Sequence, residues 1–286
     1  MTNSPLKKRY GIRTPQTLKS PTSTSTSTKK EQSYGVQVEN DVVVIPFQSK
    51  QPQTAFAPQW NYFIAELMMP DVDVDSLKDF LLSKEDEVKS IQGLPVNDAG
   101  TGLGDDSTTA RFLYYNVFDW DHPEINKLKT GVKEFHRMYY TNILSTDSVP
   151  TIRARCWMNI MRKGDRVTKH LHGYEDSAYL SGHFTVASNN TKTIYLNPYE
   201  HATEREILLR VSNGEPPSNG NLYGAENVPG KLTLFPNYVP HMTTGHQSDE
   251  PRITLAFELT PFEDLAGRYK DGKSIKMEGE TDLPVL

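Results

Sequence analysis

Three histidines and one arginine carry the most specific chemistry in this chain of 286 residues. His170 and His172 are separated by one residue, and His241 follows far downstream. Imidazole nitrogens can hold a divalent transition metal such as Fe(II), Zn, Cu or Ni. Arg252 and Thr254 come soon after His241, and a guanidinium with a neighbouring hydroxyl can bind one carboxylate. The pattern therefore predicts a metal site with an anion site beside it.

Strand periodicity supports both halves of this prediction. Residues two apart in an extended chain point to the same side, so His170 and His172 are expected to project together. The stretch 252–259 alternates in the same way, which puts Arg252 and Thr254 on one face. An isolated pair of histidines is more often solvated, and a lone arginine is more often a surface residue. The combination, in this order along the chain, favours a functional site.

The elements around these residues are expected to be mostly short strands. From Ile152 onward, strand-like runs alternate with turns rich in Gly, Pro and Asn, and the run 230–236 ends at a proline. Such an arrangement is typical of a sandwich or barrel of the jelly-roll type. The predicted fold class is mainly β with flanking helices (α+β).

Two amphipathic helices are predicted before this strand-rich half. Apolar residues recur at helical spacing over 74–91, with Asp73 or Asp75 as the N-cap. A second helix is expected to begin near Pro123, because proline favours the first helical position. Both helices are expected to brace one sheet of the strand-rich half.

A set of short motifs between about Arg153 and Leu259 carries a resemblance to a known family. The motifs are Trp157-Met158-Asn159, His170-Leu171-His172, Leu180-Ser181-Gly182, Leu234-Phe235-Pro236, His241 and Arg252. With them the chain resembles the 2-oxoglutarate- and Fe(II)-dependent dioxygenases, and more narrowly those of bacteria and marine tailed phages. The resemblance implies a double-stranded β-helix core (jelly-roll/cupin-like), with the metal inside its open end.

The resemblance also implies a ligand set for Fe(II). His170 and His241 match the two histidine ligands of the family. His172 stands where the wider superfamily has a carboxylate ligand, and three neutral imidazoles could occupy the same facial positions. Glu175 or Asp176, in the loop that follows, could instead supply an oxygen.

A cosubstrate site follows from the same resemblance. Arg252, helped by Thr254, corresponds to the residues that bind the distal carboxylate of 2-oxoglutarate, and Asn159 and Tyr195 could complete the pocket from neighbouring strands. The implied reaction consumes 2-oxoglutarate and O2, hydroxylates an unactivated C–H bond of a protein or other substrate, and releases succinate and CO2. The metal carries this chemistry, so no acid–base residue is assigned. His183 is expected not to be a ligand.

The chain is expected to have four parts. Residues 1–34 form a disordered, basic, Ser/Thr-rich leader, and 35–150 hold N-terminal strands and the two bracing helices. The catalytic core covers 151–262 and includes a polar insertion at 200–229 whose loops shape substrate entry. Residues 263–286 form a peripheral tail.

Composition limits the partners and the compartment. Residues 1–30 contain seven basic side chains and no acidic one, although the whole chain has a formal net charge of −5. Such a leader could solubilise the protein or touch nucleic acid, and it favours a macromolecular substrate. A single cysteine, Cys156, argues against a disulfide framework. No apolar run approaches a membrane span. We therefore predict a cytoplasmic protein, in the host cytoplasm if the chain is phage-encoded.

Two other functions remain open at this stage. A non-enzymatic jelly-roll module, such as a virion or sugar-binding protein with a vestigial metal site, would need neither metal nor 2-oxoglutarate. A cupin-type dioxygenase with three histidine ligands would use the metal without a 2-oxo acid, and would leave Arg252 and Thr254 without a function. Loss of cosubstrate affinity on substitution of Arg252 would favour the 2-oxoglutarate enzyme.

Overall fold

The computed structural model describes ten stretches of the chain, all within one compact unit, Tyr34–Leu286. These stretches are residues 36–38, 42–48, 61–91, 103, 108, 115–172, 179–198, 203–212, 222–261 and 281–283. The predicted leader, the alternative ligands Glu175 and Asp176, and most of the predicted tail lie outside the described residues. Among the helices in these stretches, none is long and apolar enough to cross a membrane.

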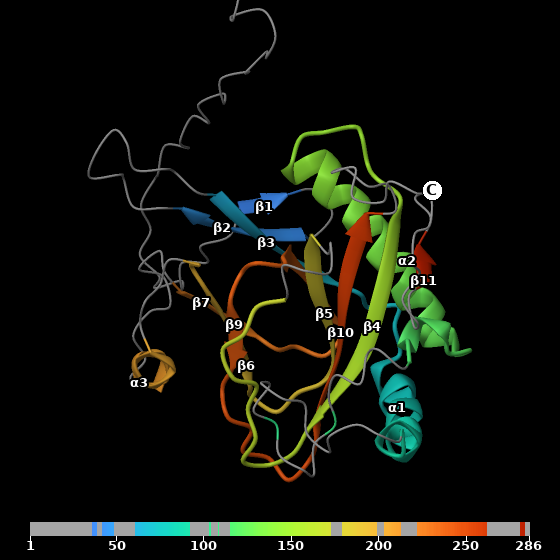
Figure 1. The fold of residues 1–286 in the computed structure, drawn as a ribbon, viewed down its shortest axis with the longest axis vertical. Helices are drawn as coiled ribbons and strands as arrows, with labels where there is room; N and C mark the ends of the chain where they lie inside the picture. Colours follow the sequence, from blue (N-terminus) through green and yellow to red (C-terminus); the bar gives the residue numbers. More distant parts are fainter. Residues whose placement is uncertain are drawn as a thin grey trace, which may run out of the picture. The chain divides into compact units, whose positions relative to one another are not determined.

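The strands form two antiparallel sheets (Figure 1). The larger sheet runs, in spatial order, β1 (Val36–Val38), β2 (Val42–Gln48), β3 (Asn61–Met68), β8 (Lys231–Pro236), β5 (Leu180–Ala187), β10 (Arg252–Pro261), β4 (Ile152–Met161) and β11 (Thr281–Leu283). The smaller sheet runs β7 (Leu222–Glu226), β6 (Lys192–Leu196) and β9 (His241–Thr243). The mainly β class predicted from the sequence is confirmed.

The inner faces of the two sheets pack on each other as in a jelly roll. Ile64 and Phe235 of the larger sheet share one buried apolar cluster with Tyr195 and Ala225 of the smaller sheet. The predicted double-stranded β-helix core therefore agrees with the observed arrangement. The space between the sheets also holds the polar side chains described below.

Strand β10 explains why both faces of the larger sheet are buried. It lies between β5 and β4, and its residues from Arg252 to Leu259 are all buried. Ile253, Leu255 and Phe257 join the cluster that the helices cover, whereas Arg252 and the polar residues alternating with them face the smaller sheet. One strand thus supplies apolar side chains to one layer and polar side chains to the other.

The two predicted helices cover the outer face of the larger sheet (Figure 1). Helix α1 spans Val74–Lys89 with Asp73 as its N-cap, and α2 spans Pro123–Met138. The N-cap of α2 is His122, directly before the proline that predicted its start. A 3-10 turn, η2 (Val117–Asp119), precedes α2, and a π-helical turn, η3 (Tyr139–Ile143), continues it.

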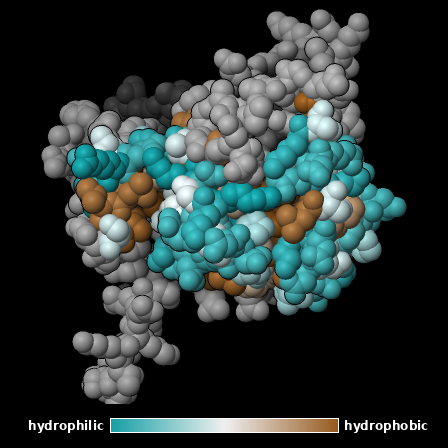
Figure 2. Space-filling model, turned by 90° about the horizontal axis from the view of Figure 1, so that it is seen from below, coloured by the Kyte–Doolittle hydropathy of each residue, from teal (hydrophilic) through white to brown (hydrophobic). Residues whose placement is uncertain are grey.

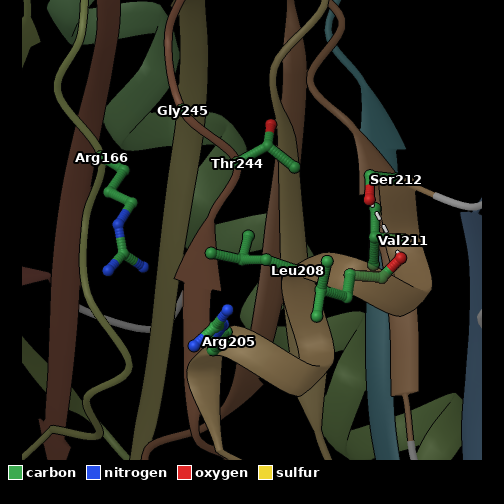
Figure 3. A pocket seen from close by; sticks show the side chains of 8 residues that line it. Arg166, Arg205, Leu208, Val211, Ser212, Thr244 and Gly245 are labelled. Atoms are coloured by element: carbon green, nitrogen blue, oxygen red, sulfur yellow. Dashed lines mark hydrogen bonds between the residues drawn. The ribbon is translucent and has the colours of Figure 1, made fainter.

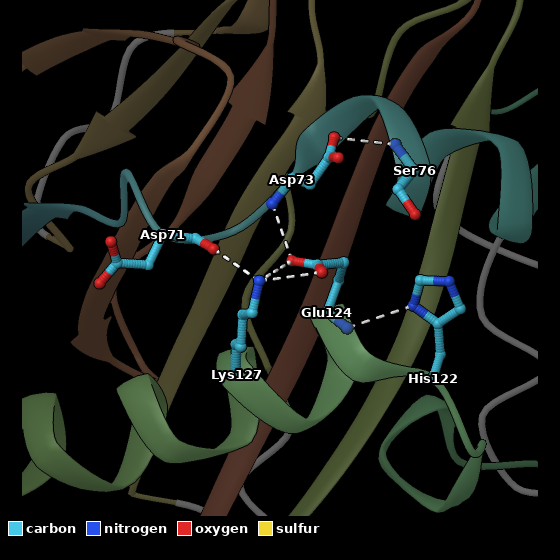
Figure 4. A network of polar contacts seen from close by, with 6 residues as sticks. All are labelled: Asp71, Asp73, Ser76, His122, Glu124 and Lys127. Carbon is cyan, nitrogen blue, oxygen red and sulfur yellow. Dashed lines mark hydrogen bonds and ion pairs between the residues drawn. The ribbon is translucent and has the colours of Figure 1, made fainter.

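A polar network joins the first turns of α1 and α2 (Figure 4). Glu124 accepts a hydrogen bond from the backbone N–H of Asp73 at 2.7 Å, and Lys127 donates to both oxygens of Glu124 at 3.0 Å. Lys127 also donates to the carbonyl of Asp71 at 2.9 Å. Glu124 therefore fixes the start of one helix against the start of the other.

The segment 200–229 contains regular structure where loops were expected. Helix α3 spans Glu204–Ser212, and β7 pairs with β6 along its whole length. The strand is part of the smaller sheet, so this portion of the segment belongs to the sandwich. Its polar and Gly-containing sequence gives only a weak strand pattern, and pairing with β6 supplies what the local sequence lacks.

Candidate functional site

The chain brings the three predicted histidines together at one end of the smaller sheet. His170 and His241 form an isolated antiparallel bridge, with N–H···O bonds of 3.0 and 2.9 Å. The backbone N–H of His172 donates to the carbonyl of Asn237 at 3.2 Å. One ligand atom from each histidine lies within 4.8 Å of those of the other two. The segment after β4 thus holds two histidines against the third.

The outward hydrogen bonds of these rings fix their tautomers. Nδ1 of His170 lies 2.9 Å from the carbonyl of Thr168, and Nδ1 of His241 lies 3.1 Å from the carbonyl of Val239. Nδ1 of His172 lies 2.6 Å from a carboxylate oxygen of Glu258. Carbonyl and ionised carboxylate oxygens only accept, so each Nδ1 must carry the proton. The lone pair of each Nε2 is left free, which is the form that binds a metal.

Electrostatics keep two of these imidazoles neutral. Burial, followed by the neighbouring His172, lowers the pKa of His170 to about 4. Burial and the two other histidines lower the pKa of His241 well below its usual value. Since only a neutral imidazole can coordinate, both rings are ready to bind a divalent metal at neutral pH. The donor set therefore fits a transition metal ion.

Glu258 is a residue of this site that the sequence analysis did not single out. Burial alone would raise the pKa of its carboxyl, but the hydrogen bond from His172 and the charge of Arg155 lower it. The sequence feature that could have pointed to Glu258 is its place on the polar face of β10, in alternation with Arg252 and Thr254. Nothing in the spacing alone ties that face to His172, which lies 86 residues earlier.

Arg252 lies in the interior, on the inner face of β10. Arg252 is only 3% exposed, and its Nη1 donates a hydrogen bond to Oγ1 of Thr254 at 3.4 Å. Its Nε has no hydrogen-bond partner, and burial lowers its pKa to about 10. Among the described residues no carboxylate pairs with it, whereas the buried Lys231 has Glu66 at 3.0 Å. A buried cation without a paired anion lowers the stability of the fold, so this position is suited to binding an anionic ligand.

Buried polar atoms without hydrogen-bond partners lie on the neighbouring strands β5 and β8. They are Nε2 of His183, Oγ1 of Thr185 and Oγ1 of Thr233. Thr185 pairs with Thr254, and His183 pairs with both Ala256 and Thr233. Groups of this kind are normally satisfied by protein, water or ligand, so together they form a polar lining with bonds still to make.

Tyr195 connects this polar lining to the histidines. It lies directly opposite His241 in the smaller sheet, and its hydroxyl is 3.4 Å from Nδ1 of His183. Burial raises its pKa well above the usual value, so the hydroxyl keeps its proton. Asn159 lies opposite Thr254 on β4, on the same face and half-buried. Each residue predicted for the metal or the cosubstrate therefore lies on this side of the larger sheet or facing it.

A separate cavity of about 530 Å³ opens beside α3 (Figure 3). Arg166 and Arg205 lie at its edge, and Leu208 and Val211 of α3 line it. Residues of α3 pack on the face of the smaller sheet that carries Met242, opposite to His241. The surface in Figure 2 is mostly hydrophilic with separate hydrophobic patches, which is ordinary for a folded chain. The α3 cavity is therefore distinct from the histidine site.

Comparison with known proteins agrees with this geometry. Residues 155–258 match the model of a family described as "Putative 2OG-Fe(II) oxygenase". Over this segment the chain is similar to the 2OG-Fe(II) oxygenases. Such an oxygenase uses Fe(II) with 2-oxoglutarate and O2 as cosubstrates. The matched segment includes every residue predicted to bind metal or cosubstrate, and Glu258 is its last residue. No match is found among curated proteins.

Three of the solved structures that match this chain have low sequence identity to it. A Pseudomonas putida prolyl-4-hydroxylase is 10% identical, with 70% of this chain and 93% of that chain covered and a TM-score of 0.43. A Trichoplax adhaerens prolyl hydroxylase, in complex with a hypoxia inducible factor peptide fragment, is 13% identical, with 69% and 83% covered and a TM-score of 0.46. HygX from Streptomyces hygroscopicus, with nickel and 2-oxoglutarate bound, is 14% identical, with 69% and 83% covered and a TM-score of 0.41. The narrower resemblance to phage enzymes stays a prediction.

Proposed function

We propose that this oxygenase holds Fe(II) through Nε2 of His170, His172 and His241. The proposal is supported by the closeness of the three ligand atoms and by the acceptors that hold the proton on each Nδ1. Three ligands on one face of the ion leave positions open for cosubstrate and O2, as in other non-haem Fe(II) sites. Glu175 and Asp176 are not needed for a complete facial set.

We propose that Arg252 and Thr254 bind the distal carboxylate of 2-oxoglutarate. The observation that carries this assignment is the buried guanidinium with no carboxylate partner among the described residues. A 2-oxo diacid would give it that partner while its other end reaches the metal. The unpaired hydroxyl of Thr185 would donate a further hydrogen bond to the same ligand.

Tyr195 and Asn159 are assigned supporting roles in this pocket. The ring of Tyr195 lies 6.0 Å from that of His241 between centroids, and its hydroxyl is 3.4 Å from Nδ1 of His183, so it could donate to a cosubstrate oxygen. Asn159 lies next to Thr254 in the ladder and would help to close the pocket on the β4 side. Trp157 and Phe235 contact the histidine rings, with ring centroids 5.7 Å from His172 and 4.9 Å from His241, and would exclude water from the metal.

The proposed reaction is the hydroxylation of an unactivated C–H bond. Bound Fe(II) supplies the oxidising chemistry, in which 2-oxoglutarate, O2 and R–H give succinate, CO2 and R–OH. One oxygen atom enters succinate and the other enters the product, so no further reductant is needed. The basic segment 1–30 favours a macromolecule, such as a protein, as R–H.

Succinate formation tests this function without knowledge of the primary substrate. The Fe(II)-loaded protein should convert 2-oxoglutarate to succinate in a reaction that requires O2. His241→Ala should reduce the rate at least about 100-fold, because a lost ligand empties the site. His122→Asn removes a remote histidine while keeping a good N-cap, and should leave the rate unchanged. Equal succinate formation by the parent and by His241→Ala would refute the proposal.

A further inference from the structure

We infer that Glu258 is a positioning residue that supplies negative charge to the metal through His172. It would replace, from one hydrogen bond further out, the charge that a carboxylate ligand gives in the wider superfamily. The inference rests on the proposed function, because it concerns the ion that the three histidines hold.

The contact between Glu258 and His172 is short and shielded from water. Nδ1 of His172 and Oε1 of Glu258 are 2.6 Å apart, and the two side chains are 11% and 8% exposed for Glu258 and His172 respectively. Hydrogen bonds to an ionised carboxylate are shorter and stronger than those between neutral groups. In a site with little water, the charge of the carboxylate is felt strongly by the ring.

The three histidines differ in this respect. His170 and His241 donate from Nδ1 to the neutral carbonyls of Thr168 and Val239. Only His172 donates to a charged oxygen. His172 is also the ligand that stands at the superfamily's carboxylate position. The compensating charge therefore lies behind the one imidazole that replaced a carboxylate.

The fold holds Glu258 in place from both sides. Glu258 lies on the central strand β10, and Arg155 lies directly opposite it on β4. Ser181 is its partner on the other neighbouring strand, β5. A carboxylate carried by a central strand between two paired neighbours cannot move far, so it orients the His172 ring as well as charging it.

The expected consequence is a stronger metal ligand. A carboxylate that accepts from the outer N–H of a histidine raises the basicity of the inner nitrogen, and its loss typically weakens metal affinity 10- to 100-fold. Glu258→Gln keeps an acceptor of the same size near Nδ1 and removes the charge. Its metal dissociation constant should rise about 10- to 100-fold.

Titration with Co(II) in place of Fe(II) measures this effect without turnover. The binding curves of parent and Glu258→Gln would be followed by the visible d–d absorption of Co(II) and by tryptophan quenching. Glu85→Gln is the matched control. Glu85, on α1, is also a buried carboxylate in an ion pair, 2.6 Å from Nη2 of Arg162. The control should bind Co(II) like the parent.

A double-mutant cycle separates a charge effect through His172 from a general loss of structure. If Glu258 acts through His172, Glu258→Gln should have little additional effect in a His172→Ala background. An equal loss with and without His172 would overturn the inference. Unchanged affinity in Glu258→Gln would also overturn it and leave the proposed function intact, whereas a parent that binds no Co(II) would refute the proposed metal site itself.

A measurement on the parent covers the case in which Glu258→Gln does not fold. In the Zn(II)-loaded, ¹⁵N-labelled protein, the Nδ1 proton of His172 should resonate further downfield than those of His170 and His241, because its hydrogen bond is shorter and charged. A His172 proton upfield of the other two would contradict the inference.

Discussion

Arg252 is the residue that we propose to bind the distal carboxylate of 2-oxoglutarate. Its charge is buried, its guanidinium donates a 3.4 Å hydrogen bond to Thr254, and no carboxylate in the described part of the chain pairs with it. Desolvation of an unpaired charge lowers stability, so such a residue is retained where a ligand completes the pair. The cost of the unpaired state would be offset when a dicarboxylate binds.

Replacement of Arg252 should therefore weaken cosubstrate binding and spare the metal. Removing one partner of a buried, hydrogen-bonded charge pair costs about 2 kcal/mol or more, so Arg252→Ala should raise the 2-oxoglutarate dissociation constant at least about 30-fold. Isothermal titration of the metal-loaded protein measures this. Arg205→Ala, at an exposed arginine of α3, is the control. If the protein were a cupin-type enzyme that uses no 2-oxo acid, Arg252→Ala and Arg205→Ala would give the same titration curve with 2-oxoglutarate.

The sequence predicted some residues of the proposed site and did not indicate others, for one physical reason. His170, His172, Arg252 and Thr254 could be predicted because residues two apart in a strand share a face. Glu258 shares that face but meets His172 only through the fold. The unpaired atoms of three further residues lie on strands whose neighbours the local pattern does not specify; these are His183, Thr185 and Thr233.

At the scale of elements, the junction of α1 and α2 depends on Glu124. Its carboxylate caps the start of α1 through the N–H of Asp73 and pairs with Lys127 inside its own helix (Figure 4). Burial would raise the pKa of Glu124, but these hydrogen bonds lower it overall, so the carboxylate is charged when folded. The helices that brace the larger sheet are thereby fixed to each other.

Loss of this junction should destabilise the fold without touching the metal site. Glu124→Ala leaves the N–H of Asp73 without its acceptor, which should lower the free energy of unfolding by about 1–3 kcal/mol. Glu134→Ala, at an exposed position of the same helix, should change it by less than about 0.5 kcal/mol. Urea denaturation measures both. Similar losses in the two variants would argue against the role of the junction.

Helix α2 also carries a buried histidine with a predictable acid response. His136 is fully buried and its Nε2 is hydrogen-bonded to the Tyr179 hydroxyl. Burial lowers its pKa from 6.5 to about 4. As the pH falls below about 6.5, the unfolded chain takes up a proton that the folded chain excludes, so stability is lost between pH 6.5 and 4.

The His136→Gln variant tests this response. Its stability should fall less steeply over the same pH range, by up to roughly 3 kcal/mol in total, since 2.303RT per pKa unit is 1.36 kcal/mol. Chemical denaturation of metal-free protein at pH 7, 5.5 and 4 compares the two slopes. Parallel curves for parent and variant would show that His136 does not set the acid response.

The sequence predicted the helices, whose apolar residues recur at a local spacing. It did not indicate the strand that forms only through pairing with a distant strand. The apolar spacing of 74–91 and the proline at 123 predicted α1 and α2 closely. Strand β7 lies in the segment 200–229, which was predicted to be a polar insertion whose loops shape substrate entry. The sequence of β7 itself has little strand character. Its pairing with β6 is a tertiary contact, and no single-sequence pattern reports it.

At the scale of the molecule, the proposed site joins parts that are distant along the chain. The metal ligands come from the segment after β4 and from β9, while the anion site lies on β10 of the opposite sheet. The packing of two sheets brings these parts to one interior space, and the helices on the outer face leave that space open for chemistry. The fold class could be predicted from the strand-rich composition and the resemblance, but strand order required the structure.

The measurement that tests the central claim most directly is an anaerobic titration of Fe(II)-loaded protein with 2-oxoglutarate, read at the weak visible charge-transfer band of the chelate. The account predicts a band that saturates near one equivalent in the parent, requires more cosubstrate in Arg252→Ala, and is absent in His241→Ala. Absence of the band from a parent with iron demonstrably bound would contradict the claim that metal and cosubstrate share this site.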